Sequence, residues 1–472
     1  MQGRKKVLTV IFTVVAFVLT VSFAHKTNQV LMRKTSWNRM QDLIEGETNK
    51  DILFVGTSHV MDAIVPMELW ERYGYTSYVL CAEYNDMERN IPMLRLALQY
   101  TQPELVVLDI DNYWEKSPED KTLIGYHEFA DAFPLTWEKY VTTRMLYGEN
   151  KSARREILFP FVLYHNRWND LSRNDFRDEV SDDFWRGYEF ATDSMAVAMA
   201  DPVSRSDGVL PDVYGVAAIE RFIVECKSRG IDVLLMTAPF GASTQEQEYL
   251  QGIYEIAERN GVPYVNMLED PEVINANTDY RDEGHMNISG AVKVTDYIGS
   301  YISKQYKITD RKKDESYGTW QEDYEEYRAY IREAIVNEGE LERLLILGAS
   351  DKTDSTVYIN IDSEVAEYGP YVALPWHSAV QTETDPKTVK AFRIGALLNN
   401  MVSCEKAQPF DWQEETYVKL GYEGGDGSIL GRFQPGDIYI AFYDKRTGEL
   451  ICEKAFRQEA DGSGFVECER TE

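Results

Sequence analysis

The stretch Asp51-Ile-Leu-Phe-Val-Gly-Thr-Ser-His59 gives the clearest indication of the architecture of this chain. A short apolar run that ends at Gly56 predicts a buried strand followed by a turn. The run Glu104-Leu-Val-Val-Leu-Asp109 has the same form, and its continuous Leu and Val residues suit a strand that is buried on both faces. Such strands are typical of parallel sheets that are covered by helices on both sides.

Further strands and helices alternate around these two runs. Strands are predicted over residues 51–56, 77–81, 104–109, 231–236 and 262–266, and helices through residues 67–70 and over 88–100, 213–229, 245–260 and 290–306. This alternation predicts an α/β fold with a parallel, doubly wound sheet. Ligands of such sheets bind outside the carboxyl ends of the strands, so the residues that follow each strand are candidates for a functional site.

A serine follows the first predicted strand, in the sequence Gly56-Thr-Ser58-His59. A hydroxyl in a strand-to-helix turn is presented at the edge of the sheet, where the N-terminus of the next helix offers N–H groups to a developing oxyanion. Serine is also a favoured helix N-cap. The motif therefore allows two interpretations, a nucleophile or a capping residue.

The segment Tyr280-Arg-Asp-Glu-Gly-His-Met-Asn287 follows the last predicted strand. An aspartate three residues before a histidine can hold the imidazole through Nδ1–H and leave Nε2 as a base. The alternative is a loop histidine beside a helix cap at Asn287. Because both segments lie at the carboxyl ends of strands, we predict Ser58 as a nucleophile, His285 as a base and Asp282 as an orienting acid.

The remaining ligand-forming residues do not have the spacing of a metal site. The six histidines form no H-x-x-x-H or H-E-x-x-H pattern, and the five cysteines form no C-x-x-C pair. Five cysteines are also too few for a disulfide scaffold. No catalytic metal and no cofactor are expected.

The order of the two segments, with the serine first and Asp-x-x-His last, resembles that of the SGNH (GDSL-like) hydrolase superfamily over about residues 48–306. The chain is similar to its membrane-anchored, extracytoplasmic members, such as the teichoic-acid D-alanylation protein DltD and the alginate O-acetylation proteins. Residues 159–171 also resemble a segment of such bacterial proteins. The resemblance implies a three-layer α/β/α sandwich and an enzyme that hydrolyses or transfers acyl groups.

The resemblance also implies an oxyanion hole, formed by Ser58 and by residues after the second and third strands. Where the superfamily has a glycine, this chain has Tyr84, whose N–H can donate only if its φ and ψ angles permit. The side chains of Asn85 and Asn112 are further candidate donors, although Asn112 could equally be a polar loop residue. Losing one donor costs about 100–1,000-fold in turnover.

Residues 111–212 are too many for a simple crossover between a strand and a helix. Their aromatic content, which includes Trp168, predicts a helical insertion that covers the active site and shapes a groove for a sugar acceptor. We expect substrate contacts from His165, Arg167 and Trp168, and from His59 beside the nucleophile. The alternatives are that the aromatic residues form the core of the insertion and that His59 is an exposed turn residue.

The N-terminus differs from the rest of the chain in charge and hydropathy. Residues 1–6 include Arg4, Lys5 and Lys6, and residues 7–24 are uncharged. Eighteen such residues predict a transmembrane signal-anchor helix, with a cleaved signal peptide as the alternative. We expect a single-pass protein of the cell membrane, with residues 1–6 cytoplasmic and the catalytic domain extracytoplasmic.

The C-terminal third of the chain shows a different pattern. Residues 307–345 predict a charged helical connector, in which residues 324–344 form one acidic amphipathic helix. Beyond it the apolar residues alternate with a period of two, as in residues 357–361 and 438–443. Residues 346–472 are therefore predicted to form a smaller β-rich domain for binding or assembly.

The net charge of the chain limits which classes of molecule it is expected to bind. The chain has 49 basic and 79 acidic residues, a net charge of −30, and without its first 24 residues it carries −33. Such acidity argues against binding to nucleic acid. It favours a neutral or zwitterionic glycan over a strongly anionic polymer, unless a locally basic groove forms near Arg167.

The expected function is that of an extracytoplasmic serine esterase or O-acyltransferase. Its substrate would be a cell-envelope polysaccharide or a teichoic-acid-type polymer, and the resemblance implies a membrane-bound O-acyltransferase as a partner. The alternative is a non-catalytic envelope assembly or binding protein with a degenerate SGNH fold.

Overall fold

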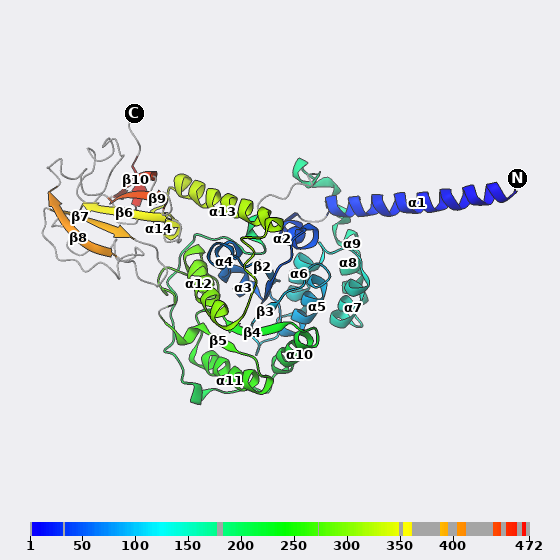
Figure 1. Ribbon diagram of the computed structural model, residues 1–472, viewed down its shortest axis with the longest axis horizontal. Coiled ribbons are helices and arrows are strands. Elements are labelled where there is room, and N and C mark those ends of the chain that lie inside the picture. Colours follow the sequence, from blue (N-terminus) through cyan, green and yellow to red (C-terminus); the bar gives the residue numbers. More distant parts are fainter. Residues whose placement is uncertain are drawn as a thin grey trace.

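The computed structural model describes residues 2–31, 34–176, 183–271, 273–348, 353–360, 388–394, 404–411, 438–444, 450–459 and 465–468. Three parts follow one another along the chain. A long N-terminal helix projects from an α/β unit, and a smaller β-sheet lies at the opposite end (Figure 1).

Five parallel strands form the central sheet of the α/β unit, in the order β2-β1-β3-β4-β5. Their bounds are Ile52–Gly56 (β1), Ser77–Cys81 (β2), Leu105–Asp109 (β3), Asp232–Thr237 (β4) and Tyr264–Asn266 (β5). The predicted α/β class with a parallel sheet is confirmed. The strand order reverses between β1 and β3, which is where doubly wound sheets bind ligands at their carboxyl ends.

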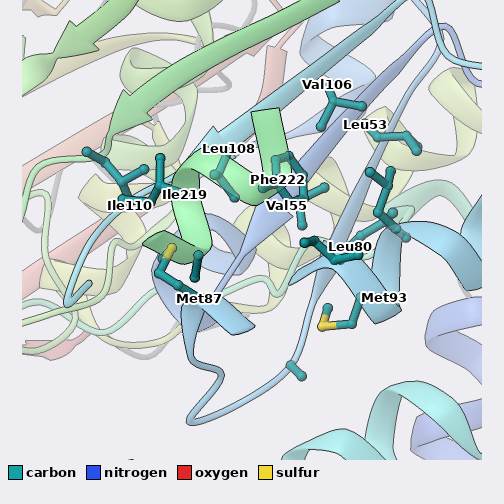
Figure 2. Packing of buried hydrophobic residues seen from close by; sticks show 14 of the residues in the cluster. Leu53, Val55, Leu80, Met87, Met93, Val106, Leu108, Ile110, Ile219 and Phe222 are labelled. Carbon is teal, nitrogen blue, oxygen red and sulfur yellow. The ribbon is translucent and has the colours of Figure 1, made fainter. Parts of the chain in front are cut away.

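Helices cover both faces of this sheet, because alternate residues of each strand point to opposite sides. Leu53 and Val55 of β1 pack in one core with the helices α5 (Met87–Ala97), α10 (Tyr214–Ser228) and α11 (Thr244–Asn260). Part of this core, including Leu108, Met93 and Phe222, is shown in Figure 2.

The other face carries a second core. There Ile52 and Phe54 pack with α3 (Ser58–Ala63), α4 (Pro66–Tyr73) and α12 (Ile288–Gln305). The helical pattern through residues 67–70 thus begins only at Pro66. Proline disfavours helical conformation in the residue before it, and Val65 is extended, so α3 and α4 are separate helices.

The segment between β3 and α10 is mostly helical. It contains α6 (Glu119–Ala130), α7 (Trp137–Tyr147), α8 (Lys151–Leu158) and α9 (Phe161–Tyr164). Among the described residues that follow, short 3-10 helices are η1 (His165–Asn169), η2 (Arg173–Phe176), η3 (Asp183–Trp185) and η4 (Arg205–Asp207). In Figure 1, α7, α8 and α9 lie along the flank of the α/β unit from which the N-terminal helix leaves.

The N-terminal helix α1 (Gln2–Leu31) precedes the amphipathic helix α2 (Lys34–Glu45). Residues Thr9–Asn28 of α1 have a mean hydropathy of 1.7, and none of them is buried in the protein. By length and composition α1 is able to cross a membrane. A signal sequence near an N-terminus has the same properties, so the structure leaves both interpretations of residues 7–24 open.

The chain ends in a β-rich part, as predicted. Among the described residues of this part, six strands form a sheet in the order β11-β10-β9-β6-β7-β8. Their bounds are Thr353–Asn360 (β6), Thr388–Ile394 (β7), Cys404–Asp411 (β8), Ile438–Asp444 (β9), Leu450–Gln458 (β10) and Phe465–Glu467 (β11). The helix predicted over residues 324–344 is wrong in one respect, because the extended residue Glu338 divides it into α13 (Gly318–Asn337) and α14 (Leu341–Gly348).

Candidate active site

Ser58 is the first residue of the short helix α3, in the turn that follows β1. Thr57 is the N-cap, and its Oγ1 accepts a hydrogen bond from the N–H of His59 at 3.2 Å. The turn is tight, because a Cβ atom at Gly56 would lie 3.0 Å from the Cβ atom of Asp109 on β3. The capping interpretation of Ser58 is therefore wrong: Thr57 has that role, and the hydroxyl of Ser58 is left for another partner.

The loop between β5 and α12 brings His285 to this hydroxyl. His285 Nε2 lies 2.8 Å from Ser58 Oγ, and His285 Nδ1 lies 2.8 Å and 3.0 Å from the two carboxylate oxygens of Asp282. When Nδ1–H donates to the carboxylate, Nε2 is unprotonated and accepts the hydrogen bond of the serine hydroxyl. The structure thus brings together the three residues that the sequence singled out.

Hydrogen bonds from the backbone hold this loop in place. Asp282 Oδ1 accepts from the N–H of Gly284 at 2.9 Å and from that of His285 at 3.0 Å, in a turn that aspartate favours. Asn287 caps α12, because its Oδ1 accepts from the N–H groups of the first turn. The helix cap and the histidine–aspartate pair, which the sequence offered as alternatives, are both present.

The local environment favours a neutral imidazole and a charged carboxylate. Burial and the neighbouring His59 lower the pKa of His285 below its ordinary value, although Asp282 acts in the opposite direction. Burial alone would raise the pKa of Asp282, but the N–H of Gly284 and the imidazole of His285 outweigh it, so this pKa is lowered. A neutral imidazole with a free Nε2 is the state that a general base requires.

His59 lies inside the site. Its side chain is only 12% exposed, and its ring contacts those of His285 and Phe240, with centroid distances of 5.3 Å and 5.4 Å. Nδ1 of His59 lies 3.2 Å from Oδ2 of Asp111. The interpretation as an exposed turn residue is therefore wrong, and His59 lines the site beside the base.

Two aspartates at the carboxyl end of β3, Asp109 and Asp111, lie beside the nucleophile turn, and sequence reasoning gave them no role. Asp111 Oδ1 accepts a hydrogen bond from Thr57 Oγ1 at 3.0 Å, so it holds the residue before Ser58. Asp109 is fully buried, and burial together with the neighbouring Asp111 raises its pKa well above the ordinary value. The sequence places Asp109 and Asp111 at the carboxyl end of a strand, but it carries no signal for the hydrogen bond between Asp111 and Thr57.

Tyr84 adopts the backbone conformation that glycine favours. Its φ angle is +51°, in the left-handed region, where a side chain other than glycine costs about 1–2 kcal/mol. The residue is 49% exposed, and Lys121 Nζ of α6 lies over its ring, 4.9 Å from the ring centroid. Residues held in such conformations cluster at functional sites, so Tyr84 stays a candidate oxyanion donor through its N–H.

The prediction that the side chain of Asn85 is an oxyanion donor is wrong. Asn85 Nδ2 donates to the carbonyl oxygen of Gly56 at 3.0 Å and to Oδ1 of Asn90 at 2.6 Å, which uses both amide hydrogens. Asn85 braces the end of β1 instead. Asn112, which also has a positive φ angle of +50°, donates one hydrogen bond to Asp111 and has a second amide hydrogen for an oxyanion.

The predicted substrate contacts in the insertion lie elsewhere. His165, Arg167 and Trp168 belong to η1, which follows α9 and contacts α1. Arg167 Nη1 donates to the carbonyl oxygen of Leu31 at the end of α1, and Nη2 donates to Asp175. In Figure 1, α9 lies on the flank near α1, away from α3 and α12. The structure therefore places these residues at the base of α1 and does not bring them to Ser58, and the acceptor groove stays a prediction.

Within the described ranges, no three His, Cys, Asp or Glu side chains gather as they would around a metal ion. No protein-family model matches this chain, and no curated protein matches it. The site is therefore defined by its own geometry: a serine, a histidine and an aspartate at the carboxyl edge of a parallel sheet, beside the point where the strand order reverses.

Proposed function

We propose that this protein is a membrane-anchored serine esterase or O-acyltransferase of the SGNH type. The observation that carries the proposal is the hydrogen-bonded series Asp282, His285 and Ser58, with both heavy-atom separations at 2.8 Å. A hydroxyl that donates to a carboxylate-oriented imidazole is the arrangement that activates serine as a nucleophile.

The reaction would proceed in two acyl transfers. Ser58 Oγ attacks the carbonyl carbon of an ester, and its proton passes to His285 Nε2. The tetrahedral intermediate then expels the alcohol, which takes that proton, and the acyl group remains on Ser58. In the second transfer, water or a sugar hydroxyl gives its proton to His285 and attacks the acyl-enzyme. The bond between the acyl group and Ser58 Oγ then breaks, Ser58 takes the proton back from His285, and the acid or the new ester is released. Asp282 stabilises the imidazolium in both steps.

The N-terminal helix supports the choice of substrate. If α1 anchors the protein with the α/β unit on the outer side, the site faces the polymers of the cell envelope. A cell-envelope polysaccharide or a teichoic-acid-type polymer is then the substrate, and a membrane-bound O-acyltransferase is a partner that would supply the acyl group. The net charge of −30 favours a neutral or zwitterionic form of that polymer.

Covalent labelling of the purified full-length protein with a fluorophosphonate tests the nucleophile. We expect the wild type to be labelled, and Ser58→Ala to lose the label. Ser243→Ala is the matched control, because Ser243 is an exposed helix N-cap whose hydroxyl bonds Glu246, and its removal should leave the label unchanged. Labelling that persists in Ser58→Ala would reject Ser58 as the nucleophile.

A folded wild-type protein that takes up no label would favour the second candidate, a non-catalytic assembly or binding protein. The specific observation behind that candidate is that Tyr84, where the superfamily has a glycine, has a side chain at a φ angle of +51°, and that the amide of Asn85 is already bonded. If the label is taken up, product analysis with water and with sugar acceptors separates hydrolase from transferase.

A further inference from the structure

The flank of the α/β unit beside α1 exposes an unusual amount of apolar surface. Among the described residues, eighteen large hydrophobic side chains outside α1 are exposed, and ten of them lie between residues 124 and 176. Five of these ten come from α9 and the segments next to it, and we call them the apolar flank: Phe159, Phe161, Leu163, Trp168 and Phe176.

The apolar flank is joined to the end of α1. Leu31 is fully buried against Tyr164 of α9, and the carbonyl oxygen of Leu31 accepts a hydrogen bond of 2.6 Å from Arg167. Tyr164 in turn donates to Asp131 at the end of α6. These contacts join the last turn of α1 to the α/β unit. The position of the apolar flank relative to α1 is therefore fixed.

The level of these contacts matches the edge of a bilayer. The uncharged stretch of α1 ends at Ala24 and the candidate span ends at Asn28, so Leu31 follows seven and three residues later, a rise of about 10 Å and about 4.5 Å along a helix. The headgroup layer on each side of a bilayer is about 5–8 Å thick. A membrane that holds Thr9–Asn28 in its hydrocarbon core would therefore place α9 and η1 at headgroup depth.

Composition also fits a lipid surface at that depth. Residues 150–176 carry five basic and three acidic side chains, in a chain whose net charge is −30. Lys151, Arg155 and Arg173 are exposed there, and lysine and arginine near a membrane attract anionic headgroups. Tryptophan and phenylalanine with an apolar body suit the interface between headgroups and acyl chains.

We propose that the apolar flank is a second membrane contact, which lies in the interface of the bilayer that α1 crosses. The proposal rests on the membrane anchoring by α1 and is independent of the chemistry at Ser58. Its occupant is a lipid surface, and the contact would fix the α/β unit at one height and one orientation on the membrane.

Quenching by brominated lipids tests this contact. The full-length protein is reconstituted in vesicles of phosphatidylcholine and phosphatidylglycerol, with ordinary or dibrominated acyl chains. The emission difference between wild type and Trp168→Phe isolates Trp168, and we expect it to lose most of its intensity in the brominated vesicles. Val224→Trp on α10 is the control, because position 224 is 61% exposed and α10 lies away from α1, so the added emission should be unchanged (Figure 1).

Two further measurements separate the possible failures. Resistance of the protein to alkaline extraction reports whether α1 is inserted, and loss on extraction would overturn the proposal together with the anchoring. Resistance to extraction with an unquenched Trp168 would overturn the lipid contact alone and leave a protein partner as the occupant. Ser58→Ala should show the same quenching as wild type, because the lipid contact does not depend on Ser58. A failure of the proposed enzyme activity is therefore distinguishable from a failure of the lipid contact.

Discussion

His59 is the residue whose position has the most direct consequence for the proposed base. Its ring contacts that of His285, and burial together with His59 lowers the pKa of His285. A base with a lowered pKa is neutral, and hence active, down to a lower pH. We therefore predict that kcat/KM on a small aryl ester rises with a midpoint below the ordinary histidine value of about 6.5.

His59→Asn removes the ring that contacts His285 and lowers its pKa, and it keeps a polar side chain near Asp111. Loss of this neighbour raises the pKa of His285, so the acid limb of the kcat/KM profile should move to higher pH. His165→Asn is the matched control, because His165 is exposed in η1 and should leave the profile unchanged. A shift to lower pH in His59→Asn would contradict the proposed coupling.

The triad could be predicted from the sequence, but its supports could not. Ser58, Asp282 and His285 follow from two rules, namely where strands end and how an aspartate holds a histidine three residues later. The roles of Asn85 and Asp111 depend on which side-chain atoms meet across three loops, and no spacing in the chain encodes that. The position of Trp168 was not predicted for a similar reason. A segment rich in aromatic residues can have the same composition whether it would bind a sugar or lie at a membrane.

At the scale of elements, the strands were the easiest to predict. Continuous apolar runs mark β1 to β5 to within two residues, because a strand buried on both faces has no polar side. Helix ends were harder, as shown by the division between α3 and α4 and by that between α13 and α14. Strands β7 and β8 were not predicted, because TVKAFRI and CEKAQPFD alternate poorly between apolar and polar residues.

Close packing of α6 on the loop after β2 leads to a prediction at the element scale. A Cβ atom at Gly125 would lie 1.9 Å from the carbonyl oxygen of Glu83, next to the strained Tyr84. Gly125→Ala must therefore displace α6 or this loop, and we expect a loss of about 1–3 kcal/mol in the free energy of unfolding. Chemical denaturation measures this loss.

Gly318→Ala is the control for this effect, because a Cβ atom there would meet nothing within 4 Å and Gly318 already has helical φ and ψ angles. It should unfold at the same or a higher denaturant concentration than wild type. Equal unfolding curves for Gly125→Ala and wild type would show that α6 does not pack closely on Glu83.

At the scale of the whole molecule, residues 307–345 are more than a connector between two domains. Trp320, Tyr327 and Ile331 of α13 are buried in one core with residues of α4 and α12. Tyr327 donates a hydrogen bond to Glu68 on α4, and Trp320 donates one to Thr48. The helix α13 therefore belongs to the packed α/β unit, and the same core extends to β10 through Phe456.

Phe456 links the β-rich part to this core and provides a test of how the molecule is held together. Its side chain is fully buried among residues of α13 and α14, and Lys454 on the same strand donates to the carbonyl oxygen of Glu338. Phe456→Ala should cost about 3–5 kcal/mol in the free energy of unfolding, because it leaves a cavity between the two parts. Val466→Ala on β11, at a position 48% exposed, should change this free energy by less than about 0.5 kcal/mol. If both variants unfold like wild type in chemical denaturation, Phe456 does not join the β-rich part to the α/β unit.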